Sequence, residues 1–209
     1  MTKVLLINGS PHKNGCTYTA LKEVSDTLNK NGIETEIYHI GTKPISGCIA
    51  CYKCRETGKC AFNDGVNEIG TRLDEFDGII LGSPVYYAGP SGQICSFCDR
   101  LFFTYAPKMA GKLAAAVVSC RRGGASASFD RLNKYFTISK MQVVGSQYWN
   151  SVHGFTPDDV MKDKEGLQTM RTLGQNMAWL LKCIELGKQN GINRPDYEAI
   201  TFTSFPDGK

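Results

Sequence analysis

The sequence has few histidines and no long hydrophobic run. The apolar run Val4–Ile7 is far too short for a secretory signal, and no segment approaches the roughly 20 apolar residues that a membrane span needs. The three histidines, His12, His39 and His153, are far apart, and the G-x-S-x-G and H-E-x-x-H motifs are absent. These absences predict a soluble, cytoplasmic protein without a membrane partner, and they give no sign of a serine hydrolase or a zinc peptidase.

Strong charge is also missing. The net charge is +4, and the lysines and arginines are scattered, which argues against a nucleic-acid partner. The hydrophobic content of 42% is typical of a globular protein, and 209 residues fit one α/β domain covering 1–209. Nine cysteines without a secretory signal point to thiol, metal or cluster chemistry instead of a disulfide scaffold.

Unbroken apolar runs alternate with segments of helical periodicity along the chain. Such runs are typical of strands buried on both faces, so the pattern predicts a parallel sheet covered by helices on both sides. The long C-terminal helix begins near residue 157 or 164, reaches Leu186 and is followed by a tail to Lys209. The predicted strands are Val4–Ile7, Glu34–Ile40, Asp77–Leu81, Lys112–Ser119 and Gln142–Tyr148, with Ser151–Thr156 irregular.

Residues Asn8–Thr17 connect the first predicted strand to the first predicted helix. Turn residues fill Asn8–Pro11, and helical spacing begins at Gly15–Thr17. Free backbone N–H groups and the positive end of the helix dipole meet there, which makes an anion site. The loop has neither G-x-G-x-x-G nor the Lys-Ser/Thr pair of a Walker loop, so it suggests a monophosphate bound without magnesium. An ordinary βα turn with a helix cap is the alternative.

Two further loops follow strands of the same predicted sheet. Ser83–Gly89 contains the adjacent tyrosines Tyr86 and Tyr87, and Ser119–Gly124 contains two arginines and two glycines. In open parallel sheets, ligands bind beyond the carboxyl ends of the strands, where the strand order switches. A phosphate loop, an aromatic loop and a glycine–arginine loop at one edge therefore predict a mononucleotide with a flat ring. Core packing of the two tyrosines is the alternative.

These three loops, read as GSPHKNGCT, GSPVYYAGPSGQ and Ser119–Gly124, resemble the NADPH-dependent FMN reductase family of flavodoxin-like flavoproteins. The resemblance covers about residues 3–150. It implies a doubly wound, five-stranded parallel sheet of order 2-1-3-4-5 with helices on both faces. It also implies FMN as cofactor, NAD(P)H as electron donor, and a homodimer or homotetramer with the flavin near a subunit boundary.

The resemblance also implies which residues contact FMN. The first loop would hold the phosphate, the second would lie against the isoalloxazine edge, and the third would close the other side of the ring. Family members commonly have Arg at the position of His12 and Asn at the position of Cys16, which leaves the backbone amides as the common feature. The implied residues are Ser10, His12, Asn14, Gly15, Cys16 and Thr17; Pro84, Val85, Tyr86, Tyr87, Ala88 and Gly89; and Ser119, Arg122, Gly123 and Gly124.

Four cysteines lie in a loop at residues 41–64, with the spacing C-x2-C-x2-C-x5-C. Thiolates this close in sequence can converge on one centre, which would order a loop that has no core of its own. Structural zinc usually uses two separated cysteine pairs, whereas this run is closer to a bacterial cluster motif. The loop resembles that of the iron–sulfur flavoproteins, which implies a 4Fe–4S cluster on Cys48, Cys51, Cys54 and Cys60. Zinc and a loop without metal are the alternatives.

Two classes of function follow. The first is an oxidoreductase in which FMN takes electrons from NAD(P)H and passes them to a quinone, a nitro compound, a flavin or a one-electron partner. The second is an electron-transfer protein that docks ferredoxin or another protein and has no small-molecule substrate of its own. Among the other cysteines, Cys95 and Cys98 are expected to be buried, whereas Cys16 at a helix N-terminus is expected to have a lowered pKa.

Overall fold

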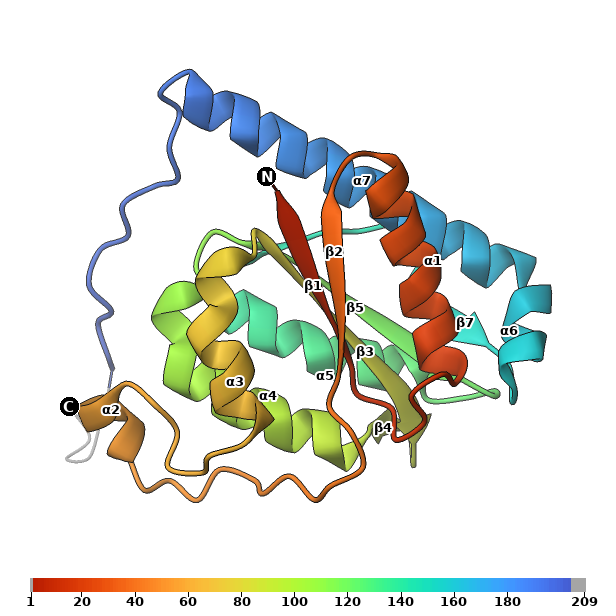
Figure 1. Ribbon diagram of the computed structural model, residues 1–209, viewed down its shortest axis with the longest axis horizontal. Coiled ribbons are helices and arrows are strands. Elements are labelled where there is room, and N and C mark those ends of the chain that lie inside the picture. Colours follow the sequence, from red (N-terminus) through yellow and green to blue (C-terminus); the bar gives the residue numbers. More distant parts are fainter. Residues whose placement is uncertain (1, 204–209) are drawn as a thin grey trace.

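The computed structural model describes residues 2–203, and its central element is a parallel sheet (Figure 1). The strand order is β2-β1-β3-β5-β6, so the predicted order 2-1-3-4-5 is confirmed when the parallel strands are counted along the chain. Two short strands lie off this path: β4 is antiparallel to β3, and β7 is parallel to β5. The bounds are β1 Lys3–Asn8, β2 Glu34–His39, β3 Gly78–Tyr86, β4 Gly89–Pro90, β5 Leu113–Cys120, β6 Gln142–Val143 and β7 Ser151–His153.

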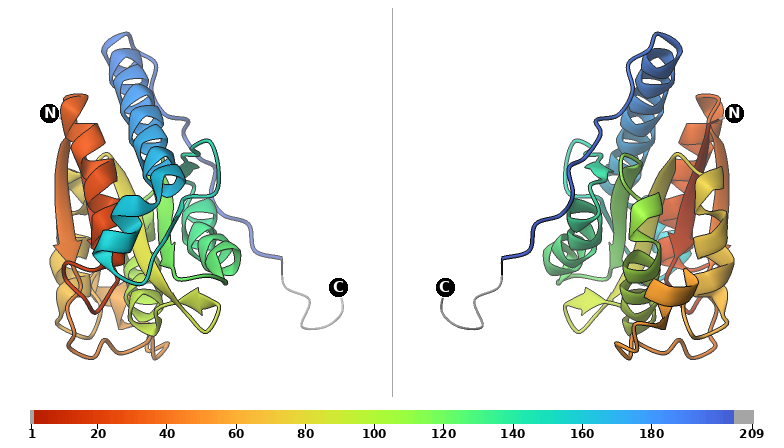
Figure 2. Two further views of the ribbon diagram at one scale, coloured as in Figure 1. Left: turned by 90° about the vertical axis from the view of Figure 1, so that its right-hand side faces the viewer. Right: turned by 90° about the vertical axis from the view of Figure 1, so that its left-hand side faces the viewer.

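Helices cover both faces of this sheet, and Figure 2 shows the two layers. α3, α4 and α5 pack on one face, and α1, α6 and α7 pack on the other. A short helix, α2, lies within the cysteine-containing loop, and 3-10 turns follow α3 and α4. The bounds are α1 Cys16–Lys30, α2 Lys53–Thr57, α3 Gly65–Arg72, α4 Gly92–Tyr105, α5 Ala125–Ile138, α6 Pro157–Lys162 and α7 Lys164–Gln189, with 3-10 turns at Leu73–Glu75 and Ala106–Lys108.

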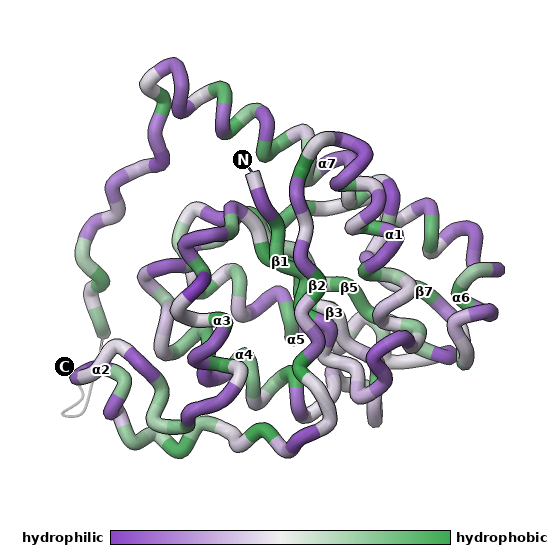
Figure 3. The backbone as a smooth tube through the Cα atoms, viewed as in Figure 1, coloured by the Kyte–Doolittle hydropathy of each residue, from purple (hydrophilic) through white to green (hydrophobic). Residues whose placement is uncertain are grey.

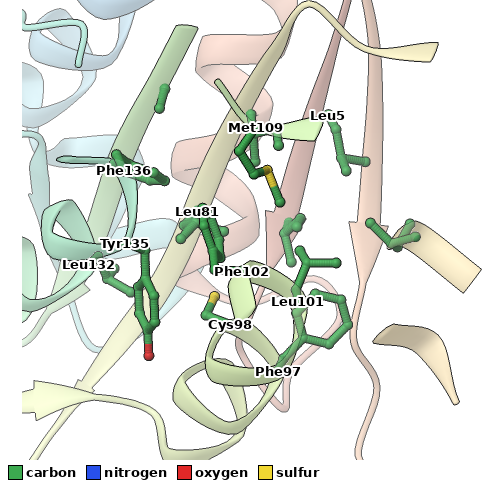
Figure 4. Close-up of a cluster of buried hydrophobic side chains, with 14 of the residues drawn as sticks. Leu5, Leu81, Phe97, Cys98, Leu101, Phe102, Met109, Leu132, Tyr135 and Phe136 are labelled. Atoms are coloured by element: carbon green, nitrogen blue, oxygen red, sulfur yellow. The ribbon is translucent and has the colours of Figure 1, made fainter. Parts of the chain in front are cut away.

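Because helices pack on both faces of the sheet, both sets of side chains of its central strands are buried, which explains their unbroken apolar sequences. Successive side chains of a strand point to opposite faces, so Leu5 and Ile7 enter one core while Val4 and Leu6 enter the other. Figure 3 shows β1 and β5 as hydrophobic segments at the centre, whereas polar and apolar residues alternate along α7. In the core drawn in Figure 4, Leu5 and Leu81 of the strands meet α4 and α5 side chains such as Phe97 and Phe136.

The long C-terminal helix packs against the first helix of the chain. α7 places Gly174 against Thr27 of α1, where an added Cβ would lie 2.8 Å from the Thr27 Cβ. After α7 the chain continues without helix or strand as far as residue 203 (Figure 2), and it still contacts the body of the protein, because Arg194 donates to the Ala110 carbonyl and the Tyr197 ring lies under Lys140. The end of the predicted tail, residues 204–209, lies outside the described residues. Between residues 2 and 203, no helix is both long and apolar enough to cross a membrane.

The predicted fifth strand, Gln142–Tyr148, is wrong in extent. Only Gln142 and Val143 pair with β5, and the chain returns to β5 as β7, in a segment expected to be irregular. The interruption has a local cause: the Ser146 hydroxyl donates to the Tyr148 carbonyl and accepts from the Tyr148 N–H, which offers the backbone an alternative to strand pairing. The Asn176 amide of α7 also donates to the Gly145 carbonyl. The fifth position of the sheet is therefore divided between β6 and β7.

Candidate functional site

The carboxyl ends of β1, β3 and β5 meet at one edge of the sheet. Asn8 of β1 is in register with Gly82 of β3, and Pro84 of β3 with Ser119 of β5. The chain leaves β1 on one side for β2 and later reaches β3 on the other, so the switch in strand order lies between β1 and β3. This edge is where an open α/β sheet binds its ligand.

The loop between β1 and α1 is held in shape by its own polar groups. The Asn8 side chain accepts from the Ser10 N–H and donates to the Lys13 carbonyl, and the Ser10 hydroxyl accepts from the His12 N–H. His39, at the end of β2, makes a 2.8 Å hydrogen bond through Nε2 with the Ser10 carbonyl. The loop is therefore fixed before any ligand binds, with the His12 and Asn14 side chains exposed.

The N-terminus of α1 is free to receive an anion. Its N-cap residue is Gly15, which provides no side-chain cap, and the first turn has no acidic residue. The backbone N–H groups of the first turn therefore lack a side-chain partner, and the helix dipole favours negative charge there. An added Cβ on Gly15 would lie 2.9 Å from the His12 Cβ, so the tight approach needs glycine. This cradle fits a phosphate group.

The segment predicted as the aromatic loop is a β-hairpin. β3 continues to Tyr86, pairs there with Gly89 of β4, and turns through Tyr87 and Ala88. Both turn residues have positive φ, +49° and +60°, as a type I′ turn requires, although neither is glycine. Such a conformation costs of order 1 kcal/mol or more per residue. The Tyr87 side chain is fully exposed and Tyr86 is about half exposed, which excludes the core-packing alternative for this pair.

The loop after β5 joins the other two. The Thr17 hydroxyl of α1 lies 2.8 Å from the Ser119 hydroxyl, and both side chains are buried. Gly124, with φ +85°, packs so closely on the hairpin that an added Cβ would lie 2.6 Å from the Ala88 Cα. The structure thus brings the three predicted segments together, while the side chain of Arg122 is exposed. The start of the first loop is also tied to β3, because the Gly9 N–H donates to the Gly82 carbonyl at 2.8 Å.

A fourth segment reaches the same edge, and it was predicted only as an irregular stretch. β7 brings His153 opposite Cys120, and the Gly154 N–H donates to the Cys120 carbonyl at 3.0 Å. The Cys16 thiol donates to the Gly154 carbonyl at 3.8 Å. The short apolar–polar alternation of Ser151–His153 was the one signal in the sequence for this strand.

The expectation of a lowered Cys16 pKa is wrong. Burial beside Gly154 raises the pKa of the thiol, and the nearby Asp159 carboxylate raises it further, whereas a backbone hydrogen bond acts in the opposite direction. Desolvation therefore outweighs the helix N-terminus at this position. Cys98 is fully buried, and burial raises its pKa well above the ordinary value, whereas Cys95 is only partly buried.

We therefore expect Cys16 to react slowly with a thiol reagent. In flavin-free protein near neutral pH, carbamidomethylation of Cys16 should be about tenfold slower than that of the exposed Cys183, because the thiolate is the reactive form and is scarce at Cys16. Peptide mass spectrometry over a time course gives both rates in one sample. Equal rates would contradict the burial of the thiol.

The four cysteines of the 41–64 loop line one pocket. Cys48, Cys51, Cys54 and Cys60 are free thiols, and they surround it together with Tyr52 and side chains of α4. Cys51 lies between two residues with positive φ, Ala50 and Tyr52. Figure 1 shows the loop at the same end of the molecule as the β3–β4 hairpin.

The geometry of the thiols does not match a single metal ion. Within residues 2–203, no three His, Cys, Asp or Glu side chains are arranged to bind one ion. Four cysteine thiols around one pocket are nevertheless the kind of donor set that iron–sulfur clusters use, and a buried cation lies behind them. That cation is Arg100 of α4, whose Nε–H donates to the Cys60 sulfur at 3.2 Å.

Arg100 was missed in the sequence. Its side chain is 1% exposed and is ion-paired with Asp64, whose oxygens lie 2.7 and 2.8 Å from the guanidinium nitrogens. Burial lowers the pKa of Arg100, but the hydrogen bonds to Asp64 and Cys60 outweigh this and keep it above its ordinary value. The one available signal was position, since Arg100 follows buried Phe97 by three residues on the core-facing side of its helix.

Comparisons with known proteins agree with this architecture. Residues 2–156 match the family model for NADPH-dependent FMN reductase. The chain is 37% identical over 193 residues to an iron–sulfur flavoprotein of Methanocaldococcus jannaschii, covering 88% of this chain and 99% of that one. It is 26% identical over 187 residues to an iron–sulfur flavoprotein of Methanosarcina thermophila, covering 88% of this chain and 97% of that one.

Solved structures show the same fold at low sequence identity. RosB, solved with a bound 8-demethyl-8-formylriboflavin-5′-phosphate, aligns with a TM-score of 0.68 and 12% identity over 100% of this chain and 94% of its own. The flavodoxin-type WrbA-like protein of Agrobacterium tumefaciens aligns with a TM-score of 0.63 and 16% identity over 88% of this chain and 99% of its own. The match to the family model and the identity to the relatives together show that this chain belongs to the NADPH-dependent FMN reductase family, in its iron–sulfur flavoprotein subgroup.

Proposed function

We propose that the protein is an FMN-dependent NAD(P)H oxidoreductase of the iron–sulfur flavoprotein type. The observation that carries the proposal is the junction of three loops at the switch point of the sheet, fixed by the Thr17–Ser119 hydrogen bond and by the packing of Gly124 on Ala88. A flavin mononucleotide has a phosphate at one end and a flat ring at the other, which matches a helix N-terminus beside an exposed aromatic hairpin.

The phosphate end of FMN would lie on the loop between β1 and α1. The first-turn N–H groups of α1 lack a side-chain cap and would donate to the phosphate oxygens, with Gly15 allowing the close approach. The hydrogen bond between the Thr17 and Ser119 hydroxyls holds the Thr17 side chain in place in the first turn of α1. The proposed phosphate residues are Ser10, His12, Asn14, Gly15, Cys16 and Thr17.

The hairpin and the loop after β5 would hold the flavin ring. When bound, FMN supplies the chemistry, because it accepts a hydride and releases electrons singly or in pairs. The chain would hold the ring against the backbone of its strained hairpin, with the exposed side chains of Tyr86 and Tyr87 available to lie beside it. The proposed ring residues are Pro84, Val85, Tyr86, Tyr87, Ala88 and Gly89, with Ser119, Arg122, Gly123 and Gly124 on the other side.

The cysteine pocket would bind a 4Fe–4S cluster through Cys48, Cys51, Cys54 and Cys60. The relatives from Methanocaldococcus and Methanosarcina are named as iron–sulfur flavoproteins, which supports this assignment. A cluster exchanges one electron at a time and would connect the flavin to a one-electron partner. The exposed apolar side chains of α7, such as Trp179 and Leu186, support a homodimer or homotetramer.

The second candidate is an electron-transfer protein that docks ferredoxin or another redox protein. It is favoured by one observation: Ile49 and Tyr52 are exposed beside the cysteine pocket, where a partner would approach. NAD(P)H oxidation with a quinone, nitro compound or free flavin as acceptor would support the enzyme. Reduction by ferredoxin alone would support the carrier.

The first experiment is an absorption spectrum of anaerobically purified protein with iron and acid-labile sulfide counts. We expect flavin bands, a broad shoulder from thiolate-ligated iron and about four irons per chain. Flavin bands without iron would contradict the cluster but leave the flavin site. Failure to bind FMN after reconstitution would contradict the assignment of all three loops.

A further inference from the structure

The side wall of the cysteine pocket contains a buried arginine whose donors are all occupied. A guanidinium has five N–H groups. In Arg100, two donate to the Asp64 carboxylate, and two donate to the Ser46 and Phe62 carbonyls at 3.2 and 3.3 Å. The fifth, on Nε, donates to the Cys60 sulfur. The side chain is therefore held in one orientation, and that orientation directs one N–H at a thiol.

The backbone of Cys60 is held by a side chain of α3. The Asn67 side chain accepts from the Cys60 N–H and donates to the Cys60 carbonyl, both at 2.9 Å. The Tyr105 hydroxyl in turn donates to the Asn67 oxygen. Among the hydrogen bonds of residues 2–203, none involves the thiols of Cys48, Cys51 or Cys54. Of the four cysteines in the 41–64 loop, Cys60 is thus the one held by side chains of α3 and α4.

This arrangement has an electrostatic effect on any group that the thiols bind. Arg100 stays charged, and its side chain is shielded from water. Reducing a thiolate-bound group adds negative charge next to this cation, and a hydrogen bond to the ligating sulfur stabilises that charge. The Asp64 carboxylate, which is about one-third exposed, opposes part of the effect.

We propose that Arg100 is a positioning residue for the group bound by the cysteine pocket, and that it raises the reduction potential of that group through its hydrogen bond to Cys60, with Asp64 lowering it. The inference rests on the proposed function of the pocket as a cluster site. It adds a prediction of sign, because the two members of one ion pair should shift the potential in opposite directions.

The test compares Arg100→Met, Asp64→Asn and wild-type protein, at equal iron content per flavin. Arg100→Met removes the cation and should move the midpoint potential of the iron centre to more negative values. Asp64→Asn removes the opposing charge and should move it to more positive values. Asparagine still accepts the Val66 N–H that Asp64 accepts at the start of α3, so the helix cap is retained. Anaerobic spectroelectrochemistry measures both potentials, with the flavin of the same protein as internal reference.

Arg55→Met is the matched control. Arg55 belongs to the same loop and stacks on Tyr52 and Phe103, with its guanidinium 4.8 and 5.8 Å from the ring centroids. No hydrogen bond from Arg55 to a thiol occurs in the described part of the chain, so its removal should shift the potential less than Arg100→Met does. Should Arg100→Met fail to accumulate, the double variant Arg100→Met/Asp64→Asn replaces it and should be more negative than Asp64→Asn alone.

The outcomes separate this inference from the proposed function. Potentials that stay at the wild-type value, or that move in the same direction in Arg100→Met and Asp64→Asn, would overturn the role of Arg100 while leaving the cluster in place. Wild-type protein without iron would overturn the cluster, and the role of Arg100 with it. Opposite shifts at full iron content would support both.

Discussion

Cys51→Ala protein, purified without air, is expected to keep its flavin and to lose its iron. Cys51 is one of four thiols around one pocket, and no hydrogen bond among residues 2–203 involves its sulfur. Its side chain is exposed, so the substitution leaves the packed core untouched. Removing a ligand should cost at least as much as removing an outer-sphere partner, which lowers metal affinity by about 10–100-fold. Iron and sulfide per chain should therefore fall by about tenfold or more.

The matched control is Cys183→Ala. Cys183 is also an exposed free cysteine, but it lies on α7, away from the pocket residues. Its replacement should leave iron, sulfide and flavin at wild-type levels. If Cys51→Ala and Cys183→Ala retained the same iron, the pocket thiols would not be ligands, and the loop would have a packing role only.

The second large effect is expected at Gly124. Alanine there would be strained twice, because φ is +85° and because the new Cβ would lie 2.6 Å from the Ala88 Cα and 2.8 Å from the Val85 Cγ1. Backbone atoms cannot move aside as a flexible side chain can, so the loop after β5 must separate from the hairpin. We expect a loss of about 1–3 kcal/mol in the free energy of unfolding and at least about a tenfold rise in the dissociation constant for FMN.

Fluorescence titration of flavin-free protein with FMN measures the affinity, and denaturant unfolding measures the stability. Gly92→Ala is the control, since Gly92 begins α4, just after the hairpin, and an added Cβ would have no heavy atom within 4 Å. Wild-type FMN affinity in Gly124→Ala would show that the close packing of this loop on the hairpin is not needed for binding.

The fold was predictable from the sequence where burial alone decides the structure. Every residue of β5 is buried. The sequence of the predicted strand Lys112–Ser119 therefore lacks the polar–apolar alternation of a half-buried strand, and it was recognisable as a buried strand. The fifth strand was not predictable in extent, because the Ser146 hydroxyl bonds to the backbone two residues away and the Asn176 amide reaches in from α7. The second of these contacts joins residues 31 positions apart, and no local pattern contains it.

The candidate site was predictable in its location but not in its detail. The order of loops along a parallel sheet was enough to bring Gly15, Tyr86 and Gly124 to one edge. The β3–β4 hairpin could not be predicted from the sequence, because its turn is formed by Tyr87 and Ala88 and not by the Asn-Gly pair that usually marks such a turn. The raised pKa of Cys16 comes first from its burial in the folded chain and then from Asp159, which is remote in sequence.

Arg100 shows a further limit. Charged residues in a helix usually face solvent, so an arginine that directly follows Asp99 in α4 is assigned to the surface by default. What buries Arg100 is Asp64, 36 residues earlier, together with three other acceptors that belong to the cysteine loop. The sequence separates these groups, and only the folded chain assembles them.

Both outer edges of the sheet are poor templates for strand addition by a second chain. Beyond β5, the two residues of β6 and the three of β7 are separated by a loop, so no continuous row of backbone donors and acceptors is available for pairing. At the opposite edge, Glu34 and Glu36 of β2 form ion pairs with Lys3, and Glu36 also pairs with Arg72, which places charge along that strand. A sheet so bounded resists edge-to-edge aggregation, and copies of this chain should associate through helical surfaces instead.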